Sequence, residues 1–291
     1  MPMFAIALKQ EQYKTYILSD QMTQSRLEVV PERGGIITQW VVRGQEILYL
    51  DAQRLTNPEL TVRGGIPILF PICGNMPNNT YTYKGQSYIL KQHGFARDLP
   101  WEVSDRTTQE FVGITLTLTS NDTTRAVYPF DFKLAVTYRL QGNSLEIYQQ
   151  ITNQSTEMMP FSIGLHPYFL VSDKSQLQFD IPATEFLNHQ DQTTHAFNGN
   201  FDFEQDEIDV LFQEPSRPSA TVTDSSRQLQ IQLSYESPYT TLVFWTVKGK
   251  DFYCLEPWSG PRNAMNTGDR LTRLEPEATL ETSIRLTVSF L

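Results

Sequence analysis

Residues 228–235 read QLQIQLSY, and this stretch has the alternation that decides the fold class. Apolar side chains occupy its second, fourth, sixth and eighth positions, and polar side chains occupy the positions between them. Successive side chains of a β-strand point to opposite faces, so a period of two predicts a strand with one buried face. The same alternation recurs in residues 114–118, 134–140 and 284–290. Residues 241–247 (TLVFWTV) form an apolar run, which indicates a strand buried on both faces.

Turn signals such as Lys84-Gly85 separate these runs. There is no long helical period and no repeat of fixed length, and only residues 51–57 and 206–212 suggest short helical turns. Many strands and few short helices predict an all-β fold, a large antiparallel β-sandwich. No linker rich in Ser, Gly or Pro divides the chain, so we interpret residues 1–291 as a single domain. The most polar stretch, residues 188–209, is expected to cross the surface.

The chain carries a formal net charge of −10 over 291 residues. Negative charge repels nucleic-acid phosphates and anionic lipid, so neither nucleic acid nor a membrane surface is an expected partner. A small sugar fits this balance, whereas a sugar phosphate requires a local basic pocket. The two cysteines, Cys73 and Cys254, are isolated thiols typical of a reduced compartment. The N-terminal residues lack the pattern of a secretion signal, and we expect a cytoplasmic protein.

A segment rich in Gly and Pro breaks the strand pattern at residues 63–71 (RGGIPILFP), and residues 93–98 (HGFARD) follow about 20 residues later. The glycine pair permits a backbone conformation closed to other residues, and the two prolines exclude a central strand with a full ladder. Arg63 and Arg97 are candidates for binding a ligand, although on residue type alone they fit surface cations equally well. His93 is a candidate site residue or a structural histidine.

The second such segment is residues 164–169 (GLHPYF), which contains His166. A residue before proline is held in an extended conformation. The aromatic neighbours are expected to desolvate the imidazole and disfavour its charged form, which tunes its pKa near neutrality. The alternative interpretation is a histidine at the edge of the core.

The third segment is residues 254–260 (CLEPWSG), in which Glu256 stands between an apolar stretch and a proline. A carboxylate at such a position is costly unless it is paired or has a function. Trp258 fits a flat platform for a pyranose ring and a core residue equally well.

Other kinds of site find little support in the sequence. His93 and His166 have no Cys, His or paired carboxylate at ligand spacing, so we expect no metal ligands. There is no G-x-S-x-G, no P-loop and no G-x-G-x-x-G. A glycosidase needs two carboxylates across one cleft, and Glu256 has no obvious partner in a comparable motif.

The four motifs RGGIPILFP, HGFARD, GLHPYF and CLEPWSG together resemble the aldose 1-epimerase (galactose mutarotase-like) superfamily, and most closely its LacX-like branch. The resemblance covers the chain from Arg63 to the C-terminus. It implies a β-supersandwich with a sugar cleft on one concave face. It also implies an isomerase that interconverts the α and β anomers of a sugar and needs no cofactor, because the reaction moves only protons.

The resemblance also implies roles for individual residues: His166 as general acid, Glu256 as general base, His93 as a second histidine near the sugar ring oxygen, and Arg63 in the cleft wall. An aspartate between His166 and Glu256 in sequence usually binds sugar hydroxyls in this superfamily. Asp209 is the best match, and Asp206 is the alternative.

Two features depart from the galactose mutarotases, which typically carry an Asn-Arg pair before a Gly-rich turn. The forms VRGGIP and HGFAR are shared with hexose-6-phosphate 1-epimerases, in which two arginines at the positions of Arg63 and Arg97 bind phosphate. Three hypotheses therefore follow, in this order: a free-aldose 1-epimerase, a hexose-6-phosphate 1-epimerase, and a non-catalytic sugar-binding sandwich. In the last of these, His166 and Glu256 need not face each other.

Overall fold

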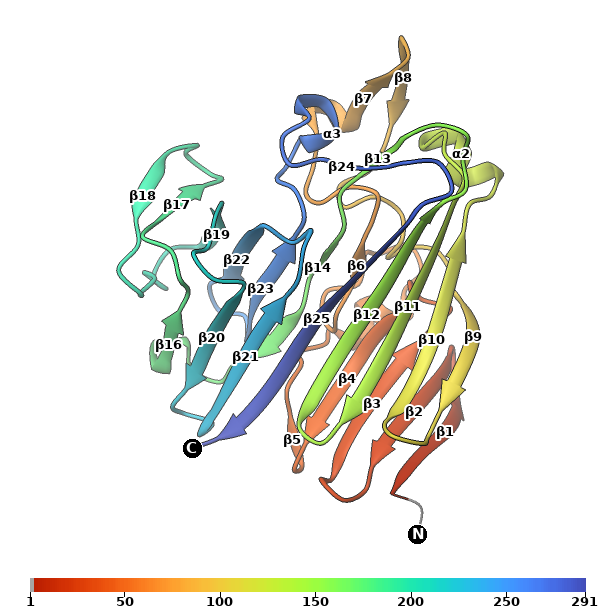
Figure 1. Cartoon of the computed structure of the whole chain (residues 1–291). Helices are drawn as coiled ribbons and strands as arrows, with labels where there is room; N and C mark the ends of the chain where they lie inside the picture. The colour runs from red at the N-terminus through yellow and green to blue at the C-terminus, as the bar shows by residue number, and fades with distance from the viewer. Residues whose placement is uncertain (1–2) are drawn as a thin grey trace.

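The computed structural model describes residues 3–291, and it confirms the antiparallel all-β fold (Figure 1). Three large sheets make up most of it, and the first is an N-terminal sheet of sequential strands. Its order is β1 (Phe4–Gln10), β2 (Lys14–Asp20), β3 (Ser25–Val30), β4 (Ile36–Val42) and β5 (Gln45–Glu46).

The central sheet has eight strands and joins segments that are far apart in sequence. Its order is β16 (Leu177–Asp180), β20 (Ser219–Asp224), β21 (Leu229–Tyr235), β25 (Thr279–Phe290), β12 (Ser144–Asn153), β11 (Phe132–Gln141), β10 (Val112–Thr119) and β9 (Glu102–Thr107).

The third sheet is built mainly from the second half of the chain. Its order is β18 (Thr194–Ala196), β17 (Glu185–Asn188), β19 (Glu207–Phe212), β22 (Thr241–Val247), β23 (Phe252–Trp258), β14 (Gly164–Leu165) and β6 (Ile68–Leu69), and β15 (Tyr168–Leu170) also pairs with β23. Strand β6 has two residues and lies at the edge of the sheet, which agrees with the expectation that Pro67 and Pro71 exclude a central strand with a full ladder.

The remaining elements are short. Two strand pairs, β7 (Thr80–Tyr83) with β8 (Gln86–Ile89) and β13 (Met159–Phe161) with β24 (Thr272–Leu274), lie at one end of the sheets, together with α2 (Asp122–Val127) and α3 (Ala264–Thr267) (Figure 1). The other helical segments are α1 (Ala52–Thr56), η1 (Pro77–Asn79) and η2 (Lys174–Gln176). Within residues 3–291, no helix has the length and apolar character needed to cross a lipid bilayer.

The alternating runs form strands at the expected positions, in β10, β11, β21 and β25. In β21, Leu229, Ile231, Leu233 and Tyr235 are all buried, and Ile231 and Leu233 lie opposite Val288 and Leu286 of β25. Removing one such side chain from water contributes about 1.5–3 kcal/mol, so the alternation specifies the register strongly. The run at residues 241–247 becomes β22, whose first four residues are buried.

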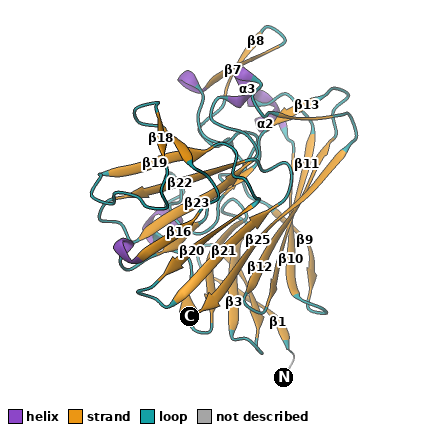
Figure 2. Ribbon diagram, turned by 60° about the vertical axis from the view of Figure 1, so that its left-hand side comes forward, coloured by secondary structure: helices purple, strands orange, loops and turns teal. Residues whose placement is uncertain are grey.

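The sheets share one large core. Strands make up most of the ordered elements around it, as Figure 2 shows. The N-terminal and third sheets meet through the isolated bridges Ile37–Ile66, Leu48–Phe169 and Leu50–Gly64. Buried residues of both sheets join the same apolar cluster as the central sheet; for example, the rings of Phe179 (β16) and Phe244 (β22) lie 5.2 Å apart. On this continuity we propose that the chain folds as one domain.

The helix expected at residues 51–57 is confirmed as α1, but the one expected at residues 206–212 is wrong. That segment is β19, which pairs along its whole length with β22. Ile208 and Val210 are buried in the main core, whereas Glu207 and Asp209 face the other way. The period of two, and not a helical period, is therefore the relevant signal here. Of residues 188–209, expected to cross the surface, residues 190–196 are exposed, but residues 207–209 belong to β19 and include the buried Ile208.

The glycine pair after Arg63 joins the N-terminal sheet to the third sheet. Gly64 has φ 133° and Gly65 has φ 63°, a region that favours glycine. A Cβ on Gly65 would lie 2.1 Å from the carbonyl oxygen of Ile37, and one on Gly64 would lie 2.5 Å from Cα of Leu50. Both glycines are therefore required by conformation and by the close approach of two backbones.

We expect Gly65→Ala to destabilise the fold much more than Gly85→Ala. Gly85 also has positive φ, at 79°, but a Cβ there meets no atom within 4 Å, so its change costs about 1 kcal/mol in backbone strain alone. Gly65→Ala adds an overpacking cost of about 1–3 kcal/mol against Ile37. Urea unfolding of both variants measures the difference, and equal losses of unfolding free energy would contradict this account.

Candidate active site

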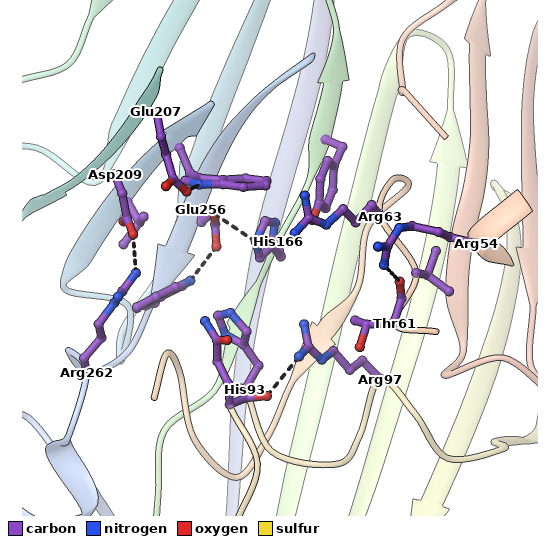
Figure 3. Close-up of a pocket in the computed structure, with 16 residues that line it drawn as sticks. Arg54, Thr61, Arg63, His93, Arg97, His166, Glu207, Asp209, Glu256 and Arg262 are labelled. Carbon is purple, nitrogen blue, oxygen red and sulfur yellow. Dashed lines mark hydrogen bonds and ion pairs between the residues drawn. The ribbon is translucent and has the colours of Figure 1, made fainter. Parts of the chain in front are cut away.

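A cavity of about 380 Å³ lies on the face of the third sheet that points away from the main core. Strands β19, β22 and β23, the segment from β14 to β15, and loops near residues 61–63, 92–97 and 262 surround it (Figure 3). Its lining consists of Arg54, Thr61, Val62, Arg63, Gln92, His93, Arg97, His166, Tyr168, Glu207, Asp209, Val243, Trp245, Glu256, Trp258 and Arg262. Six of the seven predicted site residues come from segments that interrupt the strand pattern, and all seven line this cavity.

Strand alternation explains which side chains face the cavity. In β23, Tyr253 and Leu255 belong to the main core, so Glu256 and Trp258 point to the opposite face. The register places Glu256 directly opposite Val243 of β22, and Asp209 of β19 opposite Trp245 of the same strand. Three neighbouring strands thus present their polar and aromatic side chains on one surface.

His166 and Glu256, which are 90 positions apart in sequence, meet in this cavity. The Nε2 atom of His166 lies 3.3 Å from Oε1 of Glu256, and the two residues are 7% and 1% exposed. The indole N–H of Trp258 donates a hydrogen bond of 3.1 Å to the other carboxyl oxygen of Glu256. The ring of Tyr168 stacks on that of His166 at 4.7 Å, which fixes the imidazole plane. An imidazole and a carboxyl group therefore share one buried environment.

Burial favours the neutral form of both groups. It lowers the pKa of His166 to about 3, and the positive charge of Arg97 acts in the same direction. Burial also raises the pKa of Glu256 well above its usual range, and the charge of Asp209 adds to this, against the hydrogen bond from Trp258. The sequence analysis expects a pKa near neutrality for His166, whereas burial in this cavity holds that pKa far lower. The neutral pair and the ion pair contain the same number of protons. They differ only in whether one proton lies on Glu256 or on His166, whose facing atoms are 3.3 Å apart.

His93 presents a ring N–H to the cavity. Its Nδ1 accepts a hydrogen bond of 3.0 Å from the backbone N–H of Gly74, so the neutral ring carries its proton on Nε2. Burial lowers the pKa of His93, and the nearby charge of Arg97 lowers it further. The ring centroid lies 5.5 Å from that of His166. His93 is therefore a neutral hydrogen-bond donor beside the pair.

Three arginines gather on one side of the cavity (Figure 3). Arg63 lies with its guanidinium 5.6 Å from the centre of the Trp245 ring. Arg97 donates to the backbone oxygen of Gln92 at 2.9 Å, and its buried Nε has no hydrogen-bond partner among the described residues. Arg54 donates to the backbone of Thr61 at 3.1 Å. Among residues 3–291, no carboxylate forms an ion pair with Arg63 or Arg97.

Asp209, and not Asp206, lines the cavity; Asp206 is exposed. The carboxylate of Asp209 meets Nδ1 of His189 at 2.8 Å and accepts a hydrogen bond of 2.6 Å from Arg262. Burial alone would raise the pKa of Asp209, but the contacts with His189 and Arg262 outweigh burial and hold that pKa below its usual range. The cavity therefore holds an ionised, firmly oriented acceptor opposite the arginines.

The structure changes the interpretation of Trp258. Its ring is 1% exposed and packs in a small apolar cluster, so it offers no broad open face to a sugar. Its indole N–H donates a hydrogen bond to the carboxyl group of Glu256. Trp245 is the more exposed tryptophan of the cavity wall, and its indole N–H donates to Glu207 at 2.6 Å.

Several lining residues escaped the sequence analysis. Arg262 lies two positions after the end of the CLEPWSG motif, and Glu207 stands two positions before Asp209 on the same strand face. The sequence near each residue could therefore have pointed to it. Arg54, on α1, lies in no segment that the sequence analysis singled out as a candidate site. The expectation of no metal ligands also needs qualification, since ligand atoms of His166, Cys254 and Glu256 all lie within 4.8 Å of one another. Sequence spacing could not reveal this cluster, because β15 brings His166 beside β23.

Comparisons with known proteins agree with this fold. A model of the family described as aldose 1-epimerase matches residues 19–287. The protein LacX (chromosomal) of Lactococcus lactis subsp. lactis is 27% identical over 259 residues, which cover 77% of this chain and 85% of that protein. A protein of Cenchrus ciliaris named "Putative glucose-6-phosphate 1-epimerase" is 31% identical over 168 residues, covering 54% of this chain and 47% of that one.

Two solved structures show the same architecture. The Slr1438 protein of Synechocystis sp. PCC 6803 is 46% identical, with a TM-score of 0.95 over 99% of this chain and 100% of that chain. The galactose 1-epimerase of Lactobacillus acidophilus NCFM has a TM-score of 0.78 over 99% of this chain and 98% of that chain, at 15% identity. The second likeness concerns the fold alone.

We expect the imidazole of His166 to stay neutral between pH 8 and pH 5 in the ligand-free protein. With a pKa of about 3, lowering the pH to 5 leaves roughly 99% of the rings unprotonated. Histidine NMR with ring-labelled protein measures this, and the exposed His195 provides an internal reference signal. A titration midpoint for His166 between pH 6 and 7 would show that burial does not control the pKa of this imidazole.

Proposed function

Because the chain belongs to the aldose 1-epimerase family, we propose that it interconverts the α and β anomers of a hexose by opening and reclosing the sugar ring. One observation carries this proposal: an imidazole and a carboxyl group face each other at 3.3 Å in a cavity large enough for a monosaccharide. The reaction needs a group of each kind close to the anomeric carbon.

Ring opening removes a proton from the anomeric hydroxyl and delivers one to the ring oxygen. With Glu256 as the base and His166 as the acid, the roles that the family resemblance implies, the carboxylate gains a proton and the imidazolium loses one. The pair thereby passes from charged to neutral. Rotation about the C1–C2 bond and the reverse transfers close the ring on the other face and restore the starting state.

The burial of the pair bears directly on this cycle. Burial by the surrounding protein favours the neutral pair, which is the state that accompanies the open-chain sugar in this cycle. The hydrogen bond from Trp258 favours an ionised Glu256, and a sugar hydroxyl that donates to the carboxylate acts in the same direction. Substrate binding therefore supplies part of the interaction that charges the pair before ring opening.

The remaining cavity residues are suited to holding the sugar. His93 offers an N–H donor beside His166, and Asp209 offers carboxylate oxygens that Arg262 and His189 orient. The exposed part of the Trp245 ring gives an apolar face to the wall. The non-catalytic hypothesis loses support, because it gives no reason for a buried imidazole and a buried carboxyl group to face each other.

A second candidate function, 1-epimerisation of a hexose 6-phosphate, rests on the arginine side of the cavity. Arg63 and Arg97 have no carboxylate partner within residues 3–291, and Arg54 lies on the same side (Figure 3). Guanidinium groups bind phosphate through paired hydrogen bonds. In a chain of net charge −10, this local positive charge favours an anionic group on the substrate. The name of the Cenchrus ciliaris relative points the same way.

We expect Glu256→Gln and His166→Asn each to lower kcat by about 10²–10⁴-fold, because each removes one of the two proton-transfer groups. His93→Asn should lower it less, since it disturbs orientation more than proton transfer. Polarimetry on freshly dissolved α-glucose and α-galactose gives the rates. Glu275→Gln, at an exposed glutamate, is the matched control, and thermal unfolding checks that each variant is folded. Near wild-type rates for Glu256→Gln or His166→Asn would refute the assignment.

We expect the two candidate substrates to be separated by Arg97→Gln and Arg63→Gln. A charge-assisted hydrogen bond is worth about 1.5–3 kcal/mol, so loss of one phosphate ligand should lower kcat/KM for glucose 6-phosphate by roughly 10–100-fold. The value for free glucose should change little. Arg125→Gln, at an exposed arginine far from the cavity in sequence, serves as the control. Equal wild-type use of glucose and glucose 6-phosphate would contradict the second candidate.

A further inference from the structure

The thiol of Cys254 lies directly behind the His166–Glu256 pair. Cys254 is fully buried on β23, two positions before Glu256, and it lies opposite Tyr168 of β15. The side-chain hydrogen bonds of residues 3–291 include none to its sulfur. The proton transfers proposed above do not use this thiol, which touches neither the sugar cavity nor its open side.

The three groups lie close to the separation that a small tetrahedral cation requires. Zinc binds imidazole nitrogen and carboxylate oxygen at about 2.0 Å and thiolate sulfur at about 2.3 Å, which puts its ligand atoms roughly 3.3–3.7 Å apart. The His166 and Glu256 atoms are already 3.3 Å apart, and the Cys254 sulfur lies within 4.8 Å of both. A shift of about 1 Å in the sulfur position would complete a set of three ligands. Two of them, His166 and Glu256, line the cavity, so a fourth ligand would come from the cavity side.

Charge also favours such a cation. One thiolate, one carboxylate and one neutral imidazole balance a divalent cation, so the complex as a whole is neutral. A neutral complex fits a buried site that disfavours each ionised group by itself. As the two anionic ligands bind the metal, the protons of the thiol and the carboxyl group pass to solvent. Sulfur and imidazole ligands select zinc and related thiophilic ions over magnesium or calcium.

We propose that His166, Cys254 and Glu256 form a binding site for a thiophilic divalent cation of the zinc class, and that the bound cation inhibits the enzyme. The cation occupies both proton-transfer groups at once, so it excludes the sugar chemistry. The inhibition rests on the proposed function, whereas the metal binding does not.

The binding test uses Co²⁺ as a spectroscopic probe on the full, EDTA-treated chain. Wild-type protein should show a thiolate-to-cobalt charge-transfer band in the near ultraviolet, and Cys254→Ser and Cys254→Ala should lose it. Cys73→Ser is the matched control, because Cys73 is also buried but lies outside the three-residue cluster. Thermal unfolding identifies folded variants. Absence of the band in wild-type protein, or its presence in a folded Cys254 variant, overturns the proposal.

The inhibition test measures sugar 1-epimerisation against Zn²⁺ concentration. Wild-type activity should fall with Zn²⁺ and return with EDTA. Cys254→Ser should keep its basal activity and need about 10-fold more Zn²⁺ for half inhibition, a change of about 1.4 kcal/mol. An unchanged midpoint in Cys254→Ser overturns the proposal. A cobalt band in a protein without epimerase activity would instead sink the proposed function and leave the metal site standing.

Discussion

The hydrogen-bonded register of β23 between β22 and β15 is the constraint on which the cavity depends. It places Glu256 opposite Val243 and Cys254 opposite both Trp245 and Tyr168. A slip of one residue would turn Glu256 toward the main core and Leu255 toward the cavity. Leu255, Tyr253 and Phe244 are buried in that core, so the apolar face of the sheet resists such a slip and holds the polar face in position.

The position of Glu256 is costly, and its neighbours reduce that cost. A carboxyl group that is 1% exposed is poorly solvated, and burial pushes it toward its protonated form. The indole N–H of Trp258 and the facing imidazole of His166 provide the polar contacts that remain. Because water solvates the His166–Glu256 pair poorly, a bound ligand can change the energy difference between its charged and neutral forms. Reversible proton transfer requires that these two forms be close in energy.

The cavity also separates its charges. Arg54, Arg63 and Arg97 lie on one side, whereas Asp209 and Arg262 lie on the other, joined by a hydrogen bond of 2.6 Å (Figure 3). The His166–Glu256 pair stands between them. A ligand in this cavity therefore has one end near Arg63 and Arg97, which form no ion pair within residues 3–291, and the other end near an oriented carboxylate. This arrangement limits the ways in which the ligand can bind.

The sequence by itself determined the strand character of β10, β11, β21 and β25. Apolar side chains with a period of two can all be buried on one face only if the segment is a β-strand. It also pointed to His166 and Glu256, since a histidine and a glutamate among aromatic residues and prolines break local rules. It misjudged residues 206–212, which were expected to form a short helical turn and which form strand β19 instead. Only the tertiary structure decided that His166, Cys254 and Glu256 share one environment, that Trp258 supports the carboxyl group, and that Arg54 joins the cavity. These relations arise from pairing between strands distant in the chain, and local sequence carries no record of which strands will pair.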